Sequence, residues 1–269
     1  VPHGLGQHLE FVEGTGPVLT PITGRKDLEA LSLDAQAECF LSVARTLKLL
    51  SKSLPEEGFD NTTLIGFAGS PWTVACYMVE GGGSKEFLSV KTAAVEGGWF
   101  DDLIDLITQA SIAYLKHQID AGAEALQLFD SHAGVLDEKL FERYVIAPTE
   151  QIVTCLREYA PDIPIIGFPR GAGEMYGNYA RKTGVNGLSL DPSVPLSQAQ
   201  DLQQLLPVQG NLDPAYLLSS PDKACQRSRE ICAALLDGPH IFNLGHGVNK
   251  NTDSETVAKI VSSVRGEAD

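Results

Sequence analysis

The 269-residue chain is 43% apolar and 20% charged, which is typical of an ordered globular protein and excludes an intrinsically disordered one. Its net charge of −15 argues against nucleic acid and anionic membranes as partners, and no apolar run is long enough to span a bilayer. The five cysteines are scattered without a Cys-x-x-Cys pair, so we expect free thiols in a reducing cytoplasm and no zinc site.

The chain begins with a segment that differs from the rest. The run 9-LEFVEGTGPVLTPI-22 predicts a β-hairpin with a glycine-rich turn, and apolar residues at helical spacing predict a helix over 34–53. From residue 64 onward, short apolar runs alternate with longer amphipathic segments. The predicted strands are 64–69, 124–130, 163–168, 185–191, 207–213 and 240–247. The predicted helices are 100–120, 137–158, 172–183, 195–204, 214–236 and 254–265.

This alternation predicts an α/β protein with a parallel sheet, which leaves a doubly wound open sheet or a (β/α)8 barrel. The dinucleotide-binding G-x-G-x-x-G turn is absent after every predicted strand. Every strand ends in polar or glycine-rich residues, which favours a barrel with its site at one face. A barrel needs eight strands and six are visible, so we expect a single barrel domain over 1–269 in which roughly the first two strands are missing.

The first predicted strand leads into 66-GFAGSPWTVACYMVEGGGS-84. Pro71 suits the first turn of a helix capped by Ser70, which places Tyr77 one or two turns into that helix. On pattern alone, Tyr77 is either a core-edge tyrosine or a residue that faces a site. The glycine triplet lacks the G-x-x-x-x-G-K-[ST] signature of a phosphate-binding loop.

The second predicted strand ends in Asp130, Ser131 and His132. Adjacent Ser and His suggest a hydrolase, but the G-x-S-x-G elbow is absent, so a helix cap or a polar rim is the alternative. We assign His132 a structural role and Asp130 no catalytic role. Arg170 in 167-GFPRGAG-173 is either a surface ion-pair partner or a substrate contact. His246, between two glycines after the last strand, is the functional candidate that the pattern alone indicates, with a plain loop histidine as the alternative.

Four segments together carry a resemblance: 65-IGFAGSPWTVACYMVEGGGS-84, 126-LQLFDSHAG-134, 208-VQGNLDP-214 and 243-NLGHGV-248. In order and spacing they resemble the motifs of the uroporphyrinogen decarboxylase family. The resemblance implies a (β/α)8 barrel that removes the four acetate carboxylates of uroporphyrinogen III as CO2, giving coproporphyrinogen III in haem biosynthesis. It implies no cofactor and no metal, a tetrapyrrole as substrate, and a cytoplasmic homodimer.

The resemblance also assigns roles to residues. Tyr77 and Ser131 match residues that position a substrate carboxylate, and His246 matches one that contacts a substrate side chain. Three further residues match positions that shape the cleft around the tetrapyrrole: Phe67, Gly69 and Phe129. The family's catalytic aspartate and two substrate-binding arginines fall upstream of Val1, so the resemblance implies no catalytic residue within these 269 residues and weak or no turnover by them.

Two other interpretations stay open. One is a related barrel, a corrinoid or thiol methyltransferase, whose zinc is held by a His and cysteines near the last strand. The run 243-NLGHGVNKNT-252 contains no Cys, and Cys232 falls within a predicted helix, which disfavours this interpretation. The other is a barrel fragment that binds porphyrins or supports a partner subunit without catalysis. Stoichiometric zinc in the purified protein would favour the methyltransferase interpretation.

Overall fold

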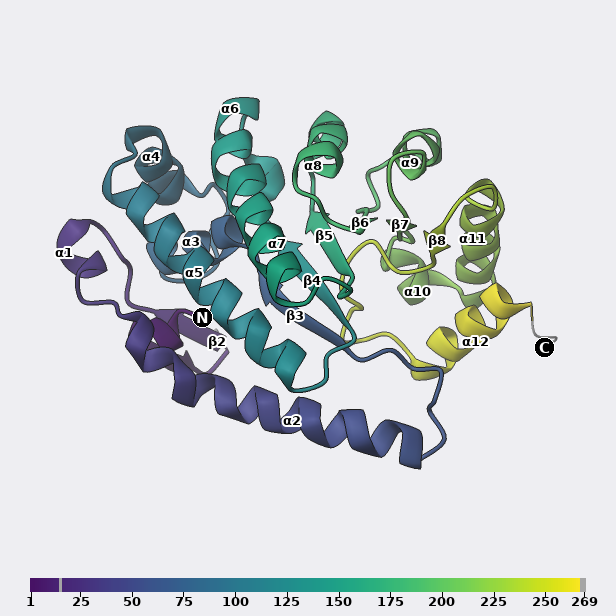
Figure 1. Ribbon diagram of the computed structural model, residues 1–269. Helices are drawn as coiled ribbons and strands as arrows, with labels where there is room; N and C mark the ends of the chain where they lie inside the picture. The colour runs from purple at the N-terminus through teal and green to yellow at the C-terminus, as the bar shows by residue number, and fades with distance from the viewer. Residues whose placement is uncertain (15, 267–269) are drawn as a thin grey trace.

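Six parallel strands, hydrogen-bonded in chain order, form the main sheet (Figure 1). The structure is a computed structural model and describes residues 1–14 and 16–266. The strands are β3 (Ile65–Gly69), β4 (Ala125–Asp130), β5 (Ile165–Pro169), β6 (Gly187–Ser189), β7 (Val208–Gln209) and β8 (His240–Ile241). The predicted α/β class with a parallel sheet is confirmed. The last three strands are shorter than predicted, because their polar ends leave the ladder and form loops.

Helices follow the strands around the outer side of the sheet (Figure 1). They are α3 (Pro71–Glu80), α4 (Leu88–Glu96), α5 (Trp99–Asp120), α6 (Glu138–Phe141), α7 (Ala147–Tyr159), α8 (Tyr176–Lys182), α9 (Leu196–Gln203), α10 (Ala215–Ser219), α11 (Pro221–Ala234) and α12 (Ser254–Arg265). The predicted helix 137–158 is interrupted by a π-helical turn at Glu142–Ile146. The predicted helix 214–236 divides at Ser220, which is extended before Pro221, as the proline ring requires.

The N-terminal segment packs against α3. The predicted hairpin is confirmed as β1 (Leu9–Val12) paired antiparallel with β2 (Gly16–Leu19), and a short helix α1 (Arg25–Leu28) precedes α2 (Gln36–Glu56). The backbone N–H groups of Leu19 and Ile22 donate to Gly81 O and Met78 O at 2.8 and 2.9 Å. Thr15, in the predicted turn, and residues 267–269, at the end of the predicted domain, lie outside the described residues.

The strand register divides the sheet residues between two faces. Phe67 pairs with Gln127 and Gln127 with Ile166, so these side chains share one face, and Gly66, Leu126 and Ile165 share the other. The second face lies under the helices: a Cβ on Gly66 would meet Gln118 of α5, and one on Gly167 would meet Tyr179 of α8. We call the first face, away from the helices, the concave face. Its register-matched residues are Ile65, Phe67, Gly69, Ala125, Gln127, Phe129, Ile166, Phe168, Gly187, Ser189, Gln209 and Ile241.

In the described part of the chain, β3 and β8 are the edge strands of this sheet. The side-chain amide of Gln118 covers part of the β3 edge, since it both accepts from Phe67 N and donates to Phe67 O at 2.9 Å. Satisfying both backbone groups of an edge residue removes a template for further strand pairing. No helix among residues 1–14 and 16–266 is long and apolar enough to cross a membrane.

Candidate active site at the carboxyl ends of the strands

The loop after β4 is fixed by a buried hydroxyl of α3. Helix α3 begins at Pro71 as predicted, but the Ser70 hydroxyl makes no capping hydrogen bond and is buried without a hydrogen-bond partner among the residues that the structure describes. Thr73, in the first turn, donates to Asp130 Oδ1 at 2.5 Å and accepts from the backbone N–H of His132 at 3.1 Å. Thr73 therefore holds both ends of the Asp130–His132 segment and so positions Ser131 between them.

The Asp130 carboxyl group lies almost completely buried on the helix-covered side of β4, only 1% exposed. Burial raises its pKa to about 7, and the hydrogen bonds from Thr73 only partly oppose this rise. Its Oδ2 atom has no hydrogen-bond partner among the described residues. The carboxyl group does not share the concave face, and the assignment of no catalytic role to Asp130 stays a prediction.

Tyr77, His132 and Phe87 form a row of rings beside this loop. The Tyr77 ring lies 5.3 Å from the His132 ring, and the His132 ring lies 4.5 Å from that of Phe87. Phe87 has φ 54°, the left-handed conformation that bulky residues rarely adopt. Burial, and to a lesser degree the charge of Arg170, lower the pKa of His132, so its ring is neutral at pH 7. His132 thus borders Tyr77 directly, which its assignment to a purely structural role did not anticipate.

The concave face combines aromatic and amide groups. Phe129 makes edge-to-face contacts with Phe67 on one side and Phe168 on the other, at 5.9 and 6.2 Å between ring centroids. Deeper in the face, the Gln209 amide nitrogen donates to Gln127 Oε1 at 3.3 Å and to Ser189 Oγ at 3.1 Å. This arrangement offers an aromatic wall in which each ring is nearly perpendicular to the next, and its polar neighbours are already hydrogen-bonded. It suits a broad ligand with a large apolar surface.

The loop after β5 is packed between its neighbours. Gly134 N donates to Arg170 O at 3.0 Å, and a Cβ on Gly134 would collide with the Gly171 carbonyl, so only glycine fits there. The next backbone N–H, of Gly171, donates to Asp191 Oδ2 at 2.8 Å. Burial would raise the pKa of Asp191, but hydrogen bonds from Ser193, Gly171 and Tyr176 outweigh it and lower that pKa.

The predicted residues fall into two groups. Phe67, Gly69, Phe129, Ser131 and Tyr77 all lie on or beside the adjoining strands β3 and β4. His246 lies apart, in the exposed loop after β8, where its Nδ1 accepts from Gly247 N at 2.6 Å.

That loop is held against the loops after β6 and β7. Gly245 N donates to Leu212 O at 2.8 Å, and a Cβ on Gly245 would meet Pro192 at 2.6 Å. In the part of the chain that the structure describes, no group of three or more His, Cys, Asp or Glu is arranged to hold a metal ion.

Sequence reasoning missed several residues that the fold brings to this region. They are Thr73, Phe87, Gln127, Phe168, Ser189 and Gln209. The strand periodicity was a usable signal for Phe168, because it stands at the same register as Phe129. No local signal marks Thr73 or Phe87, whose importance comes from contacts between distant segments.

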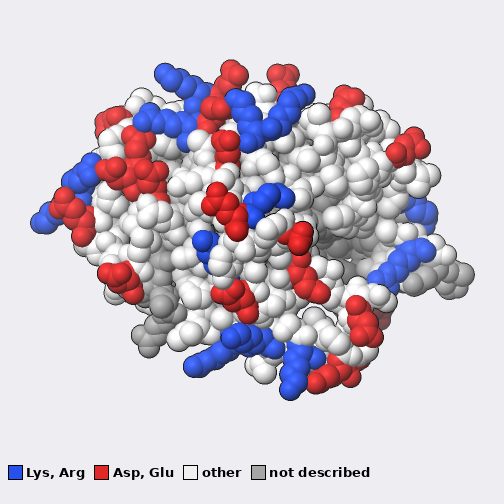
Figure 2. All heavy atoms as spheres, viewed as in Figure 1, with Lys and Arg blue, Asp and Glu red and all other residues white. Residues whose placement is uncertain are grey.

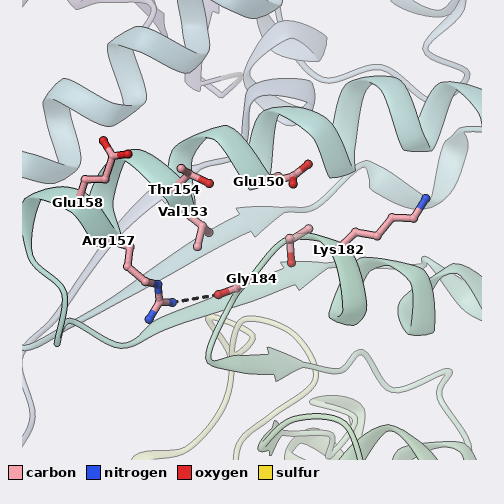
Figure 3. Close-up of a pocket in the computed structure, with 8 residues that line it drawn as sticks. Glu150, Val153, Thr154, Arg157, Glu158, Lys182 and Gly184 are labelled. Atoms are coloured by element: carbon pink, nitrogen blue, oxygen red, sulfur yellow. Dashed lines mark hydrogen bonds between the residues drawn. The ribbon is translucent and has the colours of Figure 1, made fainter.

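Charged side chains do not gather into one patch on the face seen in Figure 2, where Asp and Glu alternate with Lys and Arg. A pocket of about 340 Å³ lies on the outer side between α7 and the end of α8 (Figure 3). Glu150, Arg157, Glu158 and Lys182 line it, with Arg157 donating to Gly184 O at 3.0 Å. Since helices separate it from the concave face, this pocket is distinct from the candidate site.

We expect Arg157→Ala to destabilise the protein without changing its activity. The guanidinium donates to both Gly184 O and Asn186 Oδ1, and Asn186 Oδ1 also accepts from Ile165 N, the first residue of β5. Losing these partly exposed bonds is expected to cost about 1 kcal/mol. Urea unfolding measures the loss, with exposed Glu158→Ala as the control. A change in the KM of the enzyme for its substrate in Arg157→Ala would contradict the conclusion that this pocket is separate from the candidate site.

Comparison with known proteins identifies one structure with a similar fold and several proteins with a similar sequence. The structure resembles a B12-independent methionine synthase from Shewanella sp. W3-18-1, with a TM-score of 0.61 over 97% of this chain and 73% of that one, at 10% identity. Curated proteins named uroporphyrinogen decarboxylase are far more similar in sequence. Those of Rhodospirillum rubrum and Gluconobacter oxydans are 44% and 46% identical over 98% of this chain. The chain spans 76% and 75% of their lengths.

Successive β/α units, with polar side chains at the carboxyl ends of parallel strands, define a protein of the (β/α)-barrel class. The profile of the family described as Uroporphyrinogen decarboxylase (URO-D) matches residues 1–266. The chain belongs to the uroporphyrinogen decarboxylase family.

Proposed function

We propose that the protein is a carboxy-lyase that converts uroporphyrinogen III to coproporphyrinogen III in haem biosynthesis, and that residues 1–269 all belong to one barrel domain. The observation that carries this proposal is the 42–46% identity to proteins named uroporphyrinogen decarboxylase over 98% or more of the chain. The aromatic wall on the concave face supports it, because a tetrapyrrole is a broad, mostly apolar ring system.

The described residues contribute binding and orientation. Phe67 and Phe129 cover the tetrapyrrole, and Gly69 leaves room at the rim. Tyr77, Ser131 and His246 contact its carboxylate side chains. The pyrrole carbon next to the acetate-bearing position takes up a proton, the resulting cation accepts the electron pair of the breaking C–C bond, and CO2 leaves. The methylene carbon that held CO2 then takes up a proton, and the ring carbon releases the proton it had gained, which restores the aromatic pyrrole. Holding the acetate in one orientation favours this bond cleavage over side reactions.

Anaerobic incubation of the full-length protein with uroporphyrinogen III tests the activity. Products are oxidised and separated by carboxyl number. Porphyrins with seven to four carboxyl groups are the expected result, and stoichiometric zinc together with no decarboxylation would instead favour the methyltransferase barrel. Unchanged octacarboxyl porphyrin from a folded, full-length protein would contradict the proposed function.

Tyr77→Phe is expected to raise KM for uroporphyrinogen III about tenfold. The variant keeps the ring that contacts His132 and removes only the hydroxyl, whose hydrogen bond to a carboxylate is worth roughly 1.5–3 kcal/mol. Tyr159→Phe is the matched control, since that tyrosine is similarly exposed and lies at the far end of α7. Equal KM values for both variants and the unaltered protein would contradict the role of Tyr77.

We also propose that the protein acts as a cytoplasmic homodimer, as the family resemblance implies. Several large apolar side chains are exposed in the described chain, including Phe11 at 80% and Leu49 at 70%, which is consistent with a covered surface in an assembly. Light scattering coupled to size-exclusion chromatography measures the mass in solution, and a monomer at micromolar concentration would contradict this assignment.

A further inference from the structure

Positive charge is scarce at the carboxyl ends of the strands. The loops that join each strand of the main sheet to the next helix contain only two Arg or Lys residues within the described chain, Arg170 after β5 and Lys250 after β8. Lys250 is exposed and lies beyond His246, whereas the Arg170 side chain is half-buried. A substrate with eight carboxylates requires cations to bind it in a protein whose net charge is −15.

The backbone of Arg170 is held from three directions. Its N–H donates to Asp130 O and Phe168 O, both at 3.0 Å, and its carbonyl accepts from Gly134 N at 3.0 Å. The next residue, Gly171, is tied to Asp191. These hydrogen bonds, at the junction of three strand ends, fix the backbone position from which the Arg170 side chain extends. This fixation reduces the conformational entropy that ligand binding would otherwise remove.

The acids nearest to Arg170 in this framework are committed to other partners. Asp130 is bonded to Thr73 on the opposite side of the sheet. Asp191 accepts from Gly171 N, Tyr176 Oη, and both the N–H and hydroxyl of Ser193. Within the described residues, no carboxylate lies within ion-pair distance of the Arg170 guanidinium, so the ion-pair alternative that the sequence left open finds no partner among them. The positive charge of Arg170 contributes, after burial, to the lowered pKa of His132, whose ring lies beside Tyr77.

We propose that Arg170 is a substrate-binding residue whose guanidinium pairs with a carboxylate of the tetrapyrrole, on the side of the site formed by Ser131 and Tyr77. This assignment rests on the proposed function and extends its site to the loop after β5. A guanidinium binds a carboxylate through two parallel hydrogen bonds, which fixes orientation as well as position. Arg170 thereby selects a carboxylate-bearing edge of the ring system.

The test compares Arg170→Gln and Arg170→Lys with the unaltered full-length protein. For Arg170→Gln we expect KM for uroporphyrinogen III to rise roughly 10- to 100-fold, with a much smaller change in kcat. Arg170→Lys keeps the charge but not the paired geometry, so we expect an intermediate KM. Arg181→Gln, in the last turn of α8, is the matched control because it changes the net charge equally at the other end of that helix.

A second readout separates this proposal from the proposed function. Binding of oxidised uroporphyrin III is measured directly by calorimetry for the same four proteins. If the unaltered protein fails to decarboxylate but binds uroporphyrin III in an Arg170-dependent way, the activity is wrong and the Arg170 assignment stands. If Arg170→Gln leaves both KM and the dissociation constant within twofold of the unaltered protein, or if Arg181→Gln weakens binding equally, the Arg170 assignment is overturned.

Discussion

Replacing Gly134 with alanine is expected to destabilise the protein by about 3 kcal/mol and to displace the loop after β5. A Cβ at this position would collide with Gly171 O and would lie 2.7 Å from Gly171 C, which are backbone atoms that no side-chain rotation can move aside. Overpacking typically costs about 1–3 kcal/mol, and a rigid obstacle places this case at the upper end. For a protein of this length, such a loss lowers the melting temperature by roughly 6–12 °C.

Thermal unfolding measures the effect. Gly83→Ala is the matched control because, apart from its chain neighbours, no heavy atom of the described residues lies within 4 Å of the position that its methyl group would take. We also expect Gly134→Ala to raise KM for uroporphyrinogen III, since the Gly134 N–H to Arg170 O bond would be disturbed. An unchanged melting temperature would mean that the two loops separate easily, and the fixed position of Arg170 would then lose its support.

The second large effect concerns pH. We expect the unaltered protein to lose folding stability as the pH rises, and we expect Asp130→Asn to abolish this loss. The folded-state pKa of about 7 exceeds the ordinary value of 3.8, so the folded state holds the proton more tightly than the unfolded state. The unaltered protein is therefore most stable at low pH with respect to this group. It loses stability as the pH rises from about 4 through about 7. The full difference between the two pKa values corresponds to roughly 4 kcal/mol.

Asparagine cannot ionise, and its side-chain oxygen can still accept from the Thr73 hydroxyl. We therefore expect the free energy of unfolding of the unaltered protein to fall by a few kcal/mol relative to Asp130→Asn between pH 5 and pH 8. Urea unfolding at several pH values measures this difference. Asp201→Asn, an exposed position on α9, is the control. Parallel pH curves for Asp130→Asn and the unaltered protein would show that Asp130 is not the proton-linked group.

The order and type of the main elements followed from hydrophobic periodicity, because buried parallel strands and amphipathic helices leave different patterns. Helix α4 was missed because it starts after Phe87 in a left-handed conformation, and the side chain that accepts from its first turn is Glu80 of α3, which bonds to Val90 N at 3.0 Å. The interruption of 137–158 was also missed. It occurs around Tyr144, whose hydroxyl bonds to Ala94 O and Asp101 Oδ1, and these contacts come from other helices.

The part of the candidate site that lies close to the strand ends was predictable from the sequence, because polar residues that follow parallel strands indicate a site. Ser131 and Tyr77 were identified from motifs, and the structure places both beside the same loop. The row of rings from Tyr77 through His132 to Phe87 was not predictable, because it joins three segments that only the fold brings together. Arg170 was left ambiguous by sequence, since deciding whether a cation is paired requires knowing which acids face it.

The two faces of the sheet are under different constraints: residues on one face are needed for folding, and residues on the other face are available for ligand binding. Residues under the helices, such as Leu126 and Leu128, are fully buried and determine whether the chain folds. At the sheet edges, the concave-face residues Ile65, Phe67 and Ile241 are 43%, 58% and 49% exposed and add little to the core. Mutational robustness therefore differs sharply between neighbours in one strand. In the two edge strands, ligand preference can therefore diverge at the exposed concave-face positions while the architecture is inherited unchanged.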